Sequence, residues 1–113
     1  MIDFKDFGIE DNERYKKYLQ LCIQIPSNLS PIFLLGRRES FKFQRGYAAN
    51  ICWHKFSKGG AEFLTAPVGD WDEINWREVF AEHVPEGSRF ADVPEYPVKL
   101  WQRELGENIL VEE

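Results

Sequence analysis

The chain has 113 residues, the usual length of one domain, and its 43% hydrophobic and 29% charged residues are typical of a globular protein rather than a disordered one. Its formal net charge of −5 argues against a general nucleic-acid binder, which needs clustered Lys and Arg. No apolar run is long enough for a transmembrane segment and no export signal opens the chain, so we expect a cytoplasmic protein.

The first third of the chain has the apolar spacing of helices. After an opening segment over 1–12, the residues at i, i+3, i+4, i+7 and i+8 from Tyr15 are apolar, which predicts a helix over 12–24. Asp11 and Asn12 offer its N-terminal cap. A second helix is expected over 31–40, because Ser30 can cap it and Pro31 suits its first position.

The middle of the chain is β-prone and rich in turn residues. Alternation at Phe41 and Phe43, a β-prone run over 47–53 and another over 61–66 predict three short strands. Consecutive short strands joined by tight turns form an antiparallel meander. The turns are expected at Arg45-Gly46 and within 54–60, where the Gly59-Gly60 pair closes a hairpin.

Helices and strands alternate in the last third. A helix is expected over 71–84, with Asp70 as its N-cap and Glu73 as the acid of a capping box. A strand over 88–93 follows, then a helix that carries Val98, Trp101 and Leu105 and stops at Gly106, then a strand over 108–111. The order predicts one α+β domain over 1–113, with helices packed on a central mixed or antiparallel sheet of about five strands.

Few residues could carry chemistry. Cys52 and His54 are two positions apart on a predicted strand and share a face, which makes them a weak candidate for a metal or nucleophilic pair. We favour buried thiols for Cys52 and Cys22, and a partly buried helix residue for His83. The sequence therefore predicts no metal, no cofactor and no catalytic residue.

Clustered acids and tryptophans have structural interpretations as well. Carboxylates at the predicted helix starts complement the helix dipole, and we prefer this role to acid–base catalysis for Asp70, Asp72 and Glu73, as for Glu10, Asp11 and Glu13. The tryptophans could line an exposed contact surface, but core packing is the commoner role and the one we favour for Trp71, Trp76 and Trp101.

The order of elements resembles that of an uncharacterised bacterial family related to the C-terminal domain of phosphatidylglycerol lysyltransferases. The resemblance spans nearly the whole chain. It rests on the opening run from Phe7 to Tyr18, the segment Ser27-Asn28-Leu29-Ser30-Pro31-Ile32-Phe33-Leu34-Leu35, the aromatic strands, the turn Pro67-Val68-Gly69-Asp70, Val93-Pro94-Glu95 and Leu105-Gly106-Glu107-Asn108-Ile109.

This resemblance implies a GNAT-like acyltransferase fold, with this chain as the N-terminal half of a longer tandem-domain protein. The family usually has a Trp in the second helix, where this chain has Gly36-Arg37-Arg38, and continues past Val111-Glu112-Glu113 into a second half. Its acyl-donor site is expected mainly in that second half. No pyrophosphate-binding loop of the GNAT type is found here, so no catalytic residue carries over.

Three functional hypotheses follow. In the first hypothesis, the chain is a non-catalytic subdomain of an acyl- or aminoacyl-transferase-like protein. It packs on a catalytic C-terminal half and shapes the substrate groove of that half. The alternative is a stand-alone interaction module that binds a protein partner or dimerises through an aromatic surface. The third is a small enzyme that uses Cys52 and His54, so whether this chain is itself an enzyme stays open. Nucleic acid is not expected as a partner.

Overall fold

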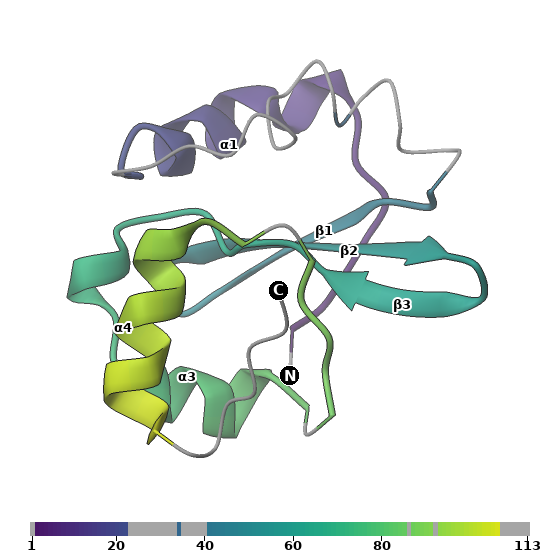
Figure 1. The fold of residues 1–113 in the computed structure, drawn as a ribbon. Coiled ribbons are helices and arrows are strands. Elements are labelled where there is room, and N and C mark those ends of the chain that lie inside the picture. The colour runs from purple at the N-terminus through teal and green to yellow at the C-terminus, as the bar shows by residue number, and fades with distance from the viewer. Residues whose placement is uncertain (1, 23–33, 35–40, 86, 92, 107–113) are drawn as a thin grey trace.

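The described part of the chain folds as a small α+β domain in which a three-stranded antiparallel sheet lies between helices (Figure 1). A computed structural model describes residues 2–22, 34, 41–85, 87–91 and 93–106. The strand order is β1-β2-β3. The elements are η1 (Ile9–Asp11), α1 (Asn12–Leu19), β1 (Gln44–Ala48), β2 (Ile51–Lys58), β3 (Ala61–Leu64), η3 (Trp71–Glu73), α3 (Trp76–His83) and α4 (Glu95–Leu105).

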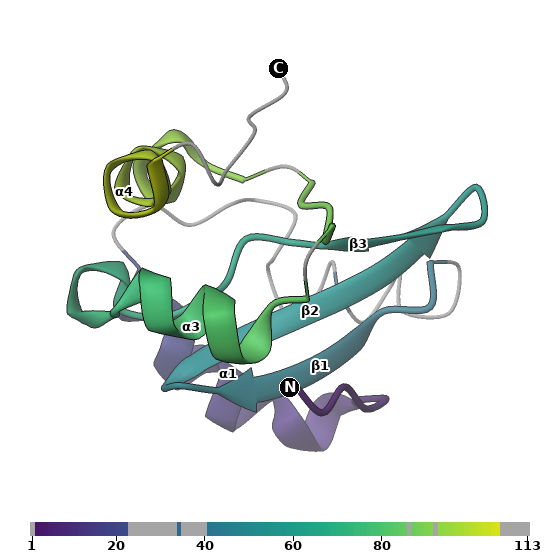
Figure 2. The same cartoon turned by 90° about the horizontal axis from the view of Figure 1, so that it is seen from below.

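Helices cover both faces of the sheet. Helix α1 lies on one face and α3 and α4 lie on the other, as the two perpendicular views agree (Figures 1 and 2). Because successive side chains of a strand point to opposite faces, Cys52 and His54 face α1, whereas Ile51 and Trp53 face α3 and α4. All four side chains are fully buried, so the first half of β2 forms the centre of two core layers.

The expected five-stranded, GNAT-like sheet is wrong for the described residues, which form three strands. The segment predicted as a strand over 88–93 contributes a single parallel bridge between Leu64 and Phe90. Both backbone hydrogen bonds of this bridge are made by Leu64, which donates to Arg89 and accepts from Ala91. The last predicted strand, over 108–111, lies outside the described residues. The α+β class itself is confirmed.

Of the two predicted hairpin turns, the one at Gly59-Gly60 is confirmed and the one at Arg45-Gly46 is wrong. Gly59 and Gly60, both with positive φ, close the β2–β3 hairpin as expected. The β1–β2 hairpin instead turns at Ala49 and Asn50, with φ of 54° and 61°, the pattern of a type I′ turn. Residues 47–53 are therefore not one strand, and residues 54–58, expected in a loop, continue β2.

Gly46, predicted as a turn residue, lies inside β1. A Cβ there would lie 2.6 Å from Cγ2 of Ile2 and 2.9 Å from the carbonyl oxygen of Asp3. The N-terminal segment runs this close because Lys5 and Arg45 exchange two backbone hydrogen bonds. Glycine is thus required by the approach of a second chain segment and not by a turn.

The chain after β3 continues along β2 through a bulge toward η3. Two residues separate Cys52 from Lys55 on β2, whereas three separate their partners Val68 and Leu64. One extra residue on one strand of an antiparallel pair is a β-bulge, which bends the strand. The bent segment over 64–69 is buried throughout.

Two helices begin or end away from their predicted bounds. Helix α1 ends at Leu19 and not at residue 24, because the amides of Leu21 and Cys22 bond to carbonyls only three residues back. Helix α3 begins at Trp76, where Asn75 caps it by accepting a hydrogen bond from the amide of Glu78. The predicted cap, Asp70, makes no side-chain capping bond.

The other expected elements have mixed outcomes. Helix α4 is confirmed, and it ends at Gly106, whose φ is 59°. The helix expected over 31–40 lies outside the described residues except Leu34, which is helical and buried. No helix among the described segments is long and apolar enough to cross a membrane. The cytoplasmic location stays a prediction.

Candidate functional site

A polar cluster lies buried between α1 and the sheet. Its centre is Arg45, which is only 3% exposed. Its Nε donates a hydrogen bond of 2.9 Å to Nε2 of His54, and its Nη1 donates one of 2.9 Å to Oδ2 of Asp11. The hydroxyl of Tyr47 donates to the same carboxylate oxygen at 2.7 Å. One carboxylate therefore binds a buried cation and a phenol, and the cluster joins the start of α1 to β1 and β2.

Aromatic rings enclose the Arg45 guanidinium. Its Cζ lies 4.1 Å from the ring centroid of Phe7 and 4.1 Å from that of Tyr15. Both rings also contact His54 edge-on. A guanidinium on an aromatic face gains electrostatic attraction and keeps its in-plane N–H groups for hydrogen bonds. The cluster is thus built from segments far apart in the sequence.

Burial shifts the pKa values of His54 and Tyr47 in the cluster. Burial, and secondly the Arg45 charge, hold the pKa of His54 well below its usual range. Because this neutral imidazole accepts at Nε2, its proton is on Nδ1. Burial and the hydrogen bond to Asp11 raise the pKa of Tyr47. Nδ1 of His54 and Nη2 of Arg45 are buried without a hydrogen-bond partner among the described residues.

The structure brings Cys52 and His54 to one face of β2, as the spacing predicts, but does not activate them. Both are fully buried, and burial raises the pKa of the Cys52 thiol to about 12. A thiol with this pKa is protonated at neutral pH and is a poor nucleophile. Nε2 of His54 is already occupied by Arg45. Cys22 and Cys52 are both free thiols, and Cys52 is buried as expected.

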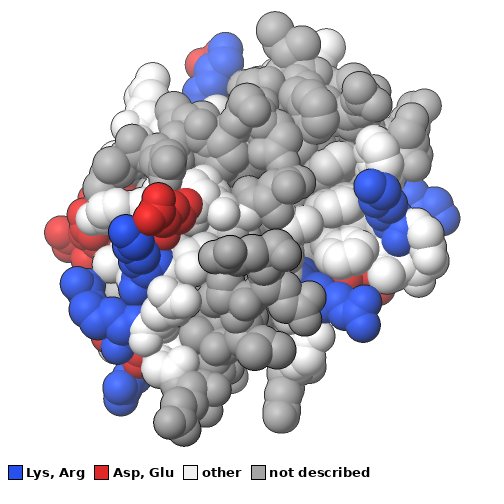
Figure 3. All heavy atoms as spheres, in the orientation of Figure 1, with Lys and Arg blue, Asp and Glu red and all other residues white. Residues whose placement is uncertain are grey.

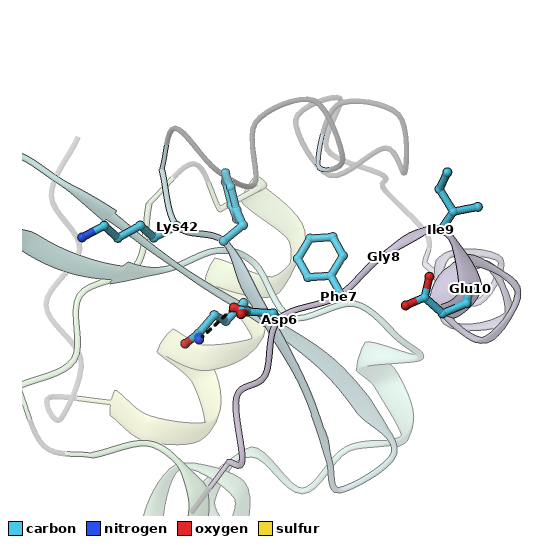
Figure 4. A pocket seen from close by; sticks show the side chains of 8 residues that line it. Asp6, Phe7, Gly8, Ile9, Glu10 and Lys42 are labelled. Carbon is cyan, nitrogen blue, oxygen red and sulfur yellow. Dashed lines mark hydrogen bonds between the residues drawn. The ribbon is translucent and has the colours of Figure 1, made fainter.

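An open groove of about 820 Å³ lies beside the cluster. Phe7 connects the groove with the cluster, because its ring lines the groove and also contacts the Arg45 guanidinium. In Figure 4 the Phe7 ring stands between the carboxylates of Asp6 and Glu10, while the Lys42 side chain points away from the ring. The groove is lined by Asp6, Phe7, Gly8, Ile9, Glu10, Lys42, Phe43 and Gln44.

The other candidate residues lie apart from this cluster. The Asp72 carboxylate accepts a hydrogen bond of 2.7 Å from the Tyr96 hydroxyl, which ties η3 to α4. His83 is half-buried at the end of α3. Within the described ranges, no group of three or more His, Cys, Asp or Glu residues is arranged to hold a metal ion.

The tryptophans are core residues, as favoured from the sequence. Trp71, Trp76 and Trp101 are at most 2% exposed and pack with Trp53 in the layer under α3 and α4. The Trp71 indole donates to the Pro67 carbonyl, and the Trp76 indole donates to the Trp71 carbonyl. These three side chains therefore form no exposed aromatic surface.

Sequence reasoning missed the centre of the cluster. Asp11 was assigned to helix capping, yet its carboxylate makes no capping bond and binds Arg45 and Tyr47 instead. Arg45 was assigned to a turn. The one available signal was an arginine within an aromatic, β-prone segment, which does not identify its partner.

Charges on the described surface are mixed in sign. On the face seen in Figure 3, acidic and basic side chains lie side by side at the left edge of the view. The ion pairs on the described surface include Lys16 with Glu13, Lys55 with Glu62 and Lys99 with Glu95. The expectation that nucleic acid is not a partner stays a prediction.

Comparisons with known proteins identify the fold but no activity. No family model and no curated protein matches the sequence. A crystal structure of a conserved protein of unknown function from Bacteroides thetaiotaomicron VPI-5482 is similar, with a TM-score of 0.73 and 19% identity. The match covers 95% of this chain and 37% of that one, so the chain spans about a third of that protein's length. Nothing in these comparisons bears on the resemblance to lysyltransferases, which stays a prediction.

Proposed function

We propose that this chain acts as a non-catalytic domain that packs on another part of a larger protein and shapes the substrate groove there. The observation that carries the proposal is the structural match, in which nearly the whole chain corresponds to 37% of a longer protein. A fold that recurs as one portion of a longer chain is suited to a role beside other domains.

The burial of the reactive groups supports a non-catalytic role. Cys52 and His54, the candidate pair for the small-enzyme hypothesis, are sealed from solvent. The charged centre formed by Arg45 and Asp11 links the N-terminal segment, α1 and the sheet to one another. Such a cluster holds segments in place, and a substrate would have to displace Phe7 or Tyr15 to reach Arg45.

The resemblance to the lysyltransferase-related family supports a further part of the proposal, namely that the larger protein is an acyl- or aminoacyl-transferase-like enzyme. In that case the reacting groups belong to the other part of the protein. The alternative, a stand-alone module that dimerises through an aromatic surface, loses its main support because Trp71, Trp76 and Trp101 are buried.

The intact mass of the endogenous protein tests the proposal. Tryptic peptides of this sequence should be found in a protein much heavier than the 13.3 kDa of this chain. Chemical cross-linking of that protein, followed by mass spectrometry, should join this domain to residues of the additional part. An endogenous protein of 13.3 kDa that runs as a monomer would overturn the proposal.

A further inference from the structure

Among the described residues, two carboxylates in the groove between the N-terminal segment and the start of β1 have no cationic partner. Asp6 accepts only a hydrogen bond of 3.2 Å from the Gln44 amide, and Glu10 has no ion pair among the described residues. The exposed Lys42 side chain points away from them (Figure 4). Other exposed acids differ in this respect: Glu13 and Glu62 have a lysine within 4 Å, whereas Glu73 and Glu78 have no ion pair among the described residues.

Apolar groups flank these carboxylates. The rings of Phe7 and Phe43 line the groove, and Ile9 is 74% exposed, the highest exposure of any large hydrophobic side chain described. An exposed apolar side chain beside a concave surface is typical of a contact site. Aromatic faces and carboxylates together are the groups that recognise a cationic side chain with an aliphatic stem.

The Glu10 carboxylate lies over Gly8 at the edge of the groove. Its Oε2 lies only 2.6 Å from the place that a Cβ on Gly8 would occupy, so the carboxylate folds back over Gly8. The absence of a side chain at Gly8 thus leaves room for the Glu10 carboxylate on the same side as the Phe7 ring (Figure 4). Asp6 lies on the other side of that ring, held by Gln44.

We infer that this groove binds a basic, extended peptide segment, with a lysine or arginine side chain between Asp6 and Glu10 and a neighbouring apolar side chain against Ile9 and Phe43. The inference rests on the proposed function, since the segment would belong to the other part of the larger protein. Charge complementarity selects this occupant over an acidic or purely apolar one.

Nuclear magnetic resonance of the 113-residue chain tests the inference with the peptide acetyl-Leu-Arg-Leu-Arg-amide. Saturable shifts are expected for the backbone amides over 7–10 and 43–44. The acidic peptide acetyl-Leu-Glu-Leu-Glu-amide should not bind. The neutral peptide acetyl-Leu-Gln-Leu-Gln-amide should bind at least about tenfold more weakly, because two favourable charge interactions are lost.

Matched variants connect the binding to the two carboxylates. The double variant Asp6→Asn with Glu10→Gln should weaken binding of the basic peptide about tenfold. Glu73→Gln with Glu78→Gln changes the net charge equally at exposed positions on the other side of the sheet and should leave binding unchanged. The single variant Glu10→Gln, at an exposed position, serves if the double variant loses its native spectrum.

Each remaining outcome is decisive. No saturable shift at about 5 mM peptide, shifts confined to other residues, or equal binding of the neutral peptide would overturn the inference. A heavy endogenous protein together with no peptide binding would overturn the groove inference and leave the proposed function standing. An endogenous protein of 13.3 kDa together with peptide binding would overturn the proposed function and the origin of the segment in the same protein, and would leave the preference of the groove for a basic peptide standing.

Discussion

Arg45 donates a hydrogen bond of 2.9 Å to His54 although both residues are almost completely buried. A buried cation is costly unless it is paired, and here His54 supplies a neutral acceptor while Asp11 supplies the countercharge. The imidazole therefore has to remain neutral, because a second positive charge at this distance would be strongly repelled. The stability of the fold should therefore depend both on the Asp11 carboxylate and on pH.

Asp11→Asn should destabilise the protein by about 2–3 kcal/mol in urea unfolding at pH 7, because it leaves the Arg45 charge buried without a countercharge. The amide oxygen can still accept from Tyr47, so the loss reports mainly on the ion pair. Glu13→Gln, at an exposed position of α1, should change stability by less than about 0.5 kcal/mol. Equal losses in the two variants would contradict the assigned role of Asp11.

Stability should fall as the pH drops below about 6.5, the ordinary pKa of histidine. The pKa of His54 lies well below that value in the folded state, so between the two values the unfolded chain binds a proton that the folded chain does not. Through His54 alone, the free energy of unfolding falls by at most about 1.4 kcal/mol for each pH unit of acidification.

His54→Gln, which keeps an acceptor for Arg45, should remove this part of the pH dependence. Unfolding free energies of both proteins measured between about pH 5 and pH 6.5 give the comparison, since most carboxylates titrate below that range. Parallel curves for the variant and the natural sequence would show that His54 is not the group responsible.

Ala49→Gly should stabilise the protein by about 0.5–1 kcal/mol, because Ala49 has a φ of 54°, where an L-residue with a Cβ is strained. The same change one residue earlier, Ala48→Gly, lies inside β1 and should destabilise by a similar amount. Thermal or urea unfolding measures both. Destabilisation by both glycines would mean that Ala49 is not strained in the turn.

The Cys52 thiol should react with Ellman's reagent at pH 8 at least about a thousandfold more slowly in the native protein than in urea. With a pKa of about 12, the thiol is almost entirely protonated at pH 8, and its full burial blocks access of the reagent. The variant Cys22→Ser isolates the signal of Cys52. Fast labelling of the native protein would restore the hypothesis of a Cys52–His54 enzyme.

Local signals in the sequence determined the features that depend on neighbouring residues. The Gly59-Gly60 turn and the stop of α4 at Gly106 follow from the positive φ that glycine adopts easily. The tryptophan core follows from the large apolar area of that side chain. The α+β class follows from the succession of strand-like and helix-like patterns.

Tertiary structure decided the features in which distant segments meet. Gly46 pairs with Trp53 inside β1, where Ile2 and Asp3 pass too close to leave room for a side chain. The Asp11 carboxylate makes no capping bond and instead supplies the countercharge of Arg45, 34 residues away. Among the described residues, the segment predicted as a strand over 88–93 makes only the bridge between Phe90 and Leu64. A single sequence records local propensity but not which distant residue will share a buried site. In this cluster burial is the largest cause of the lowered pKa of His54 and of the raised pKa of Tyr47.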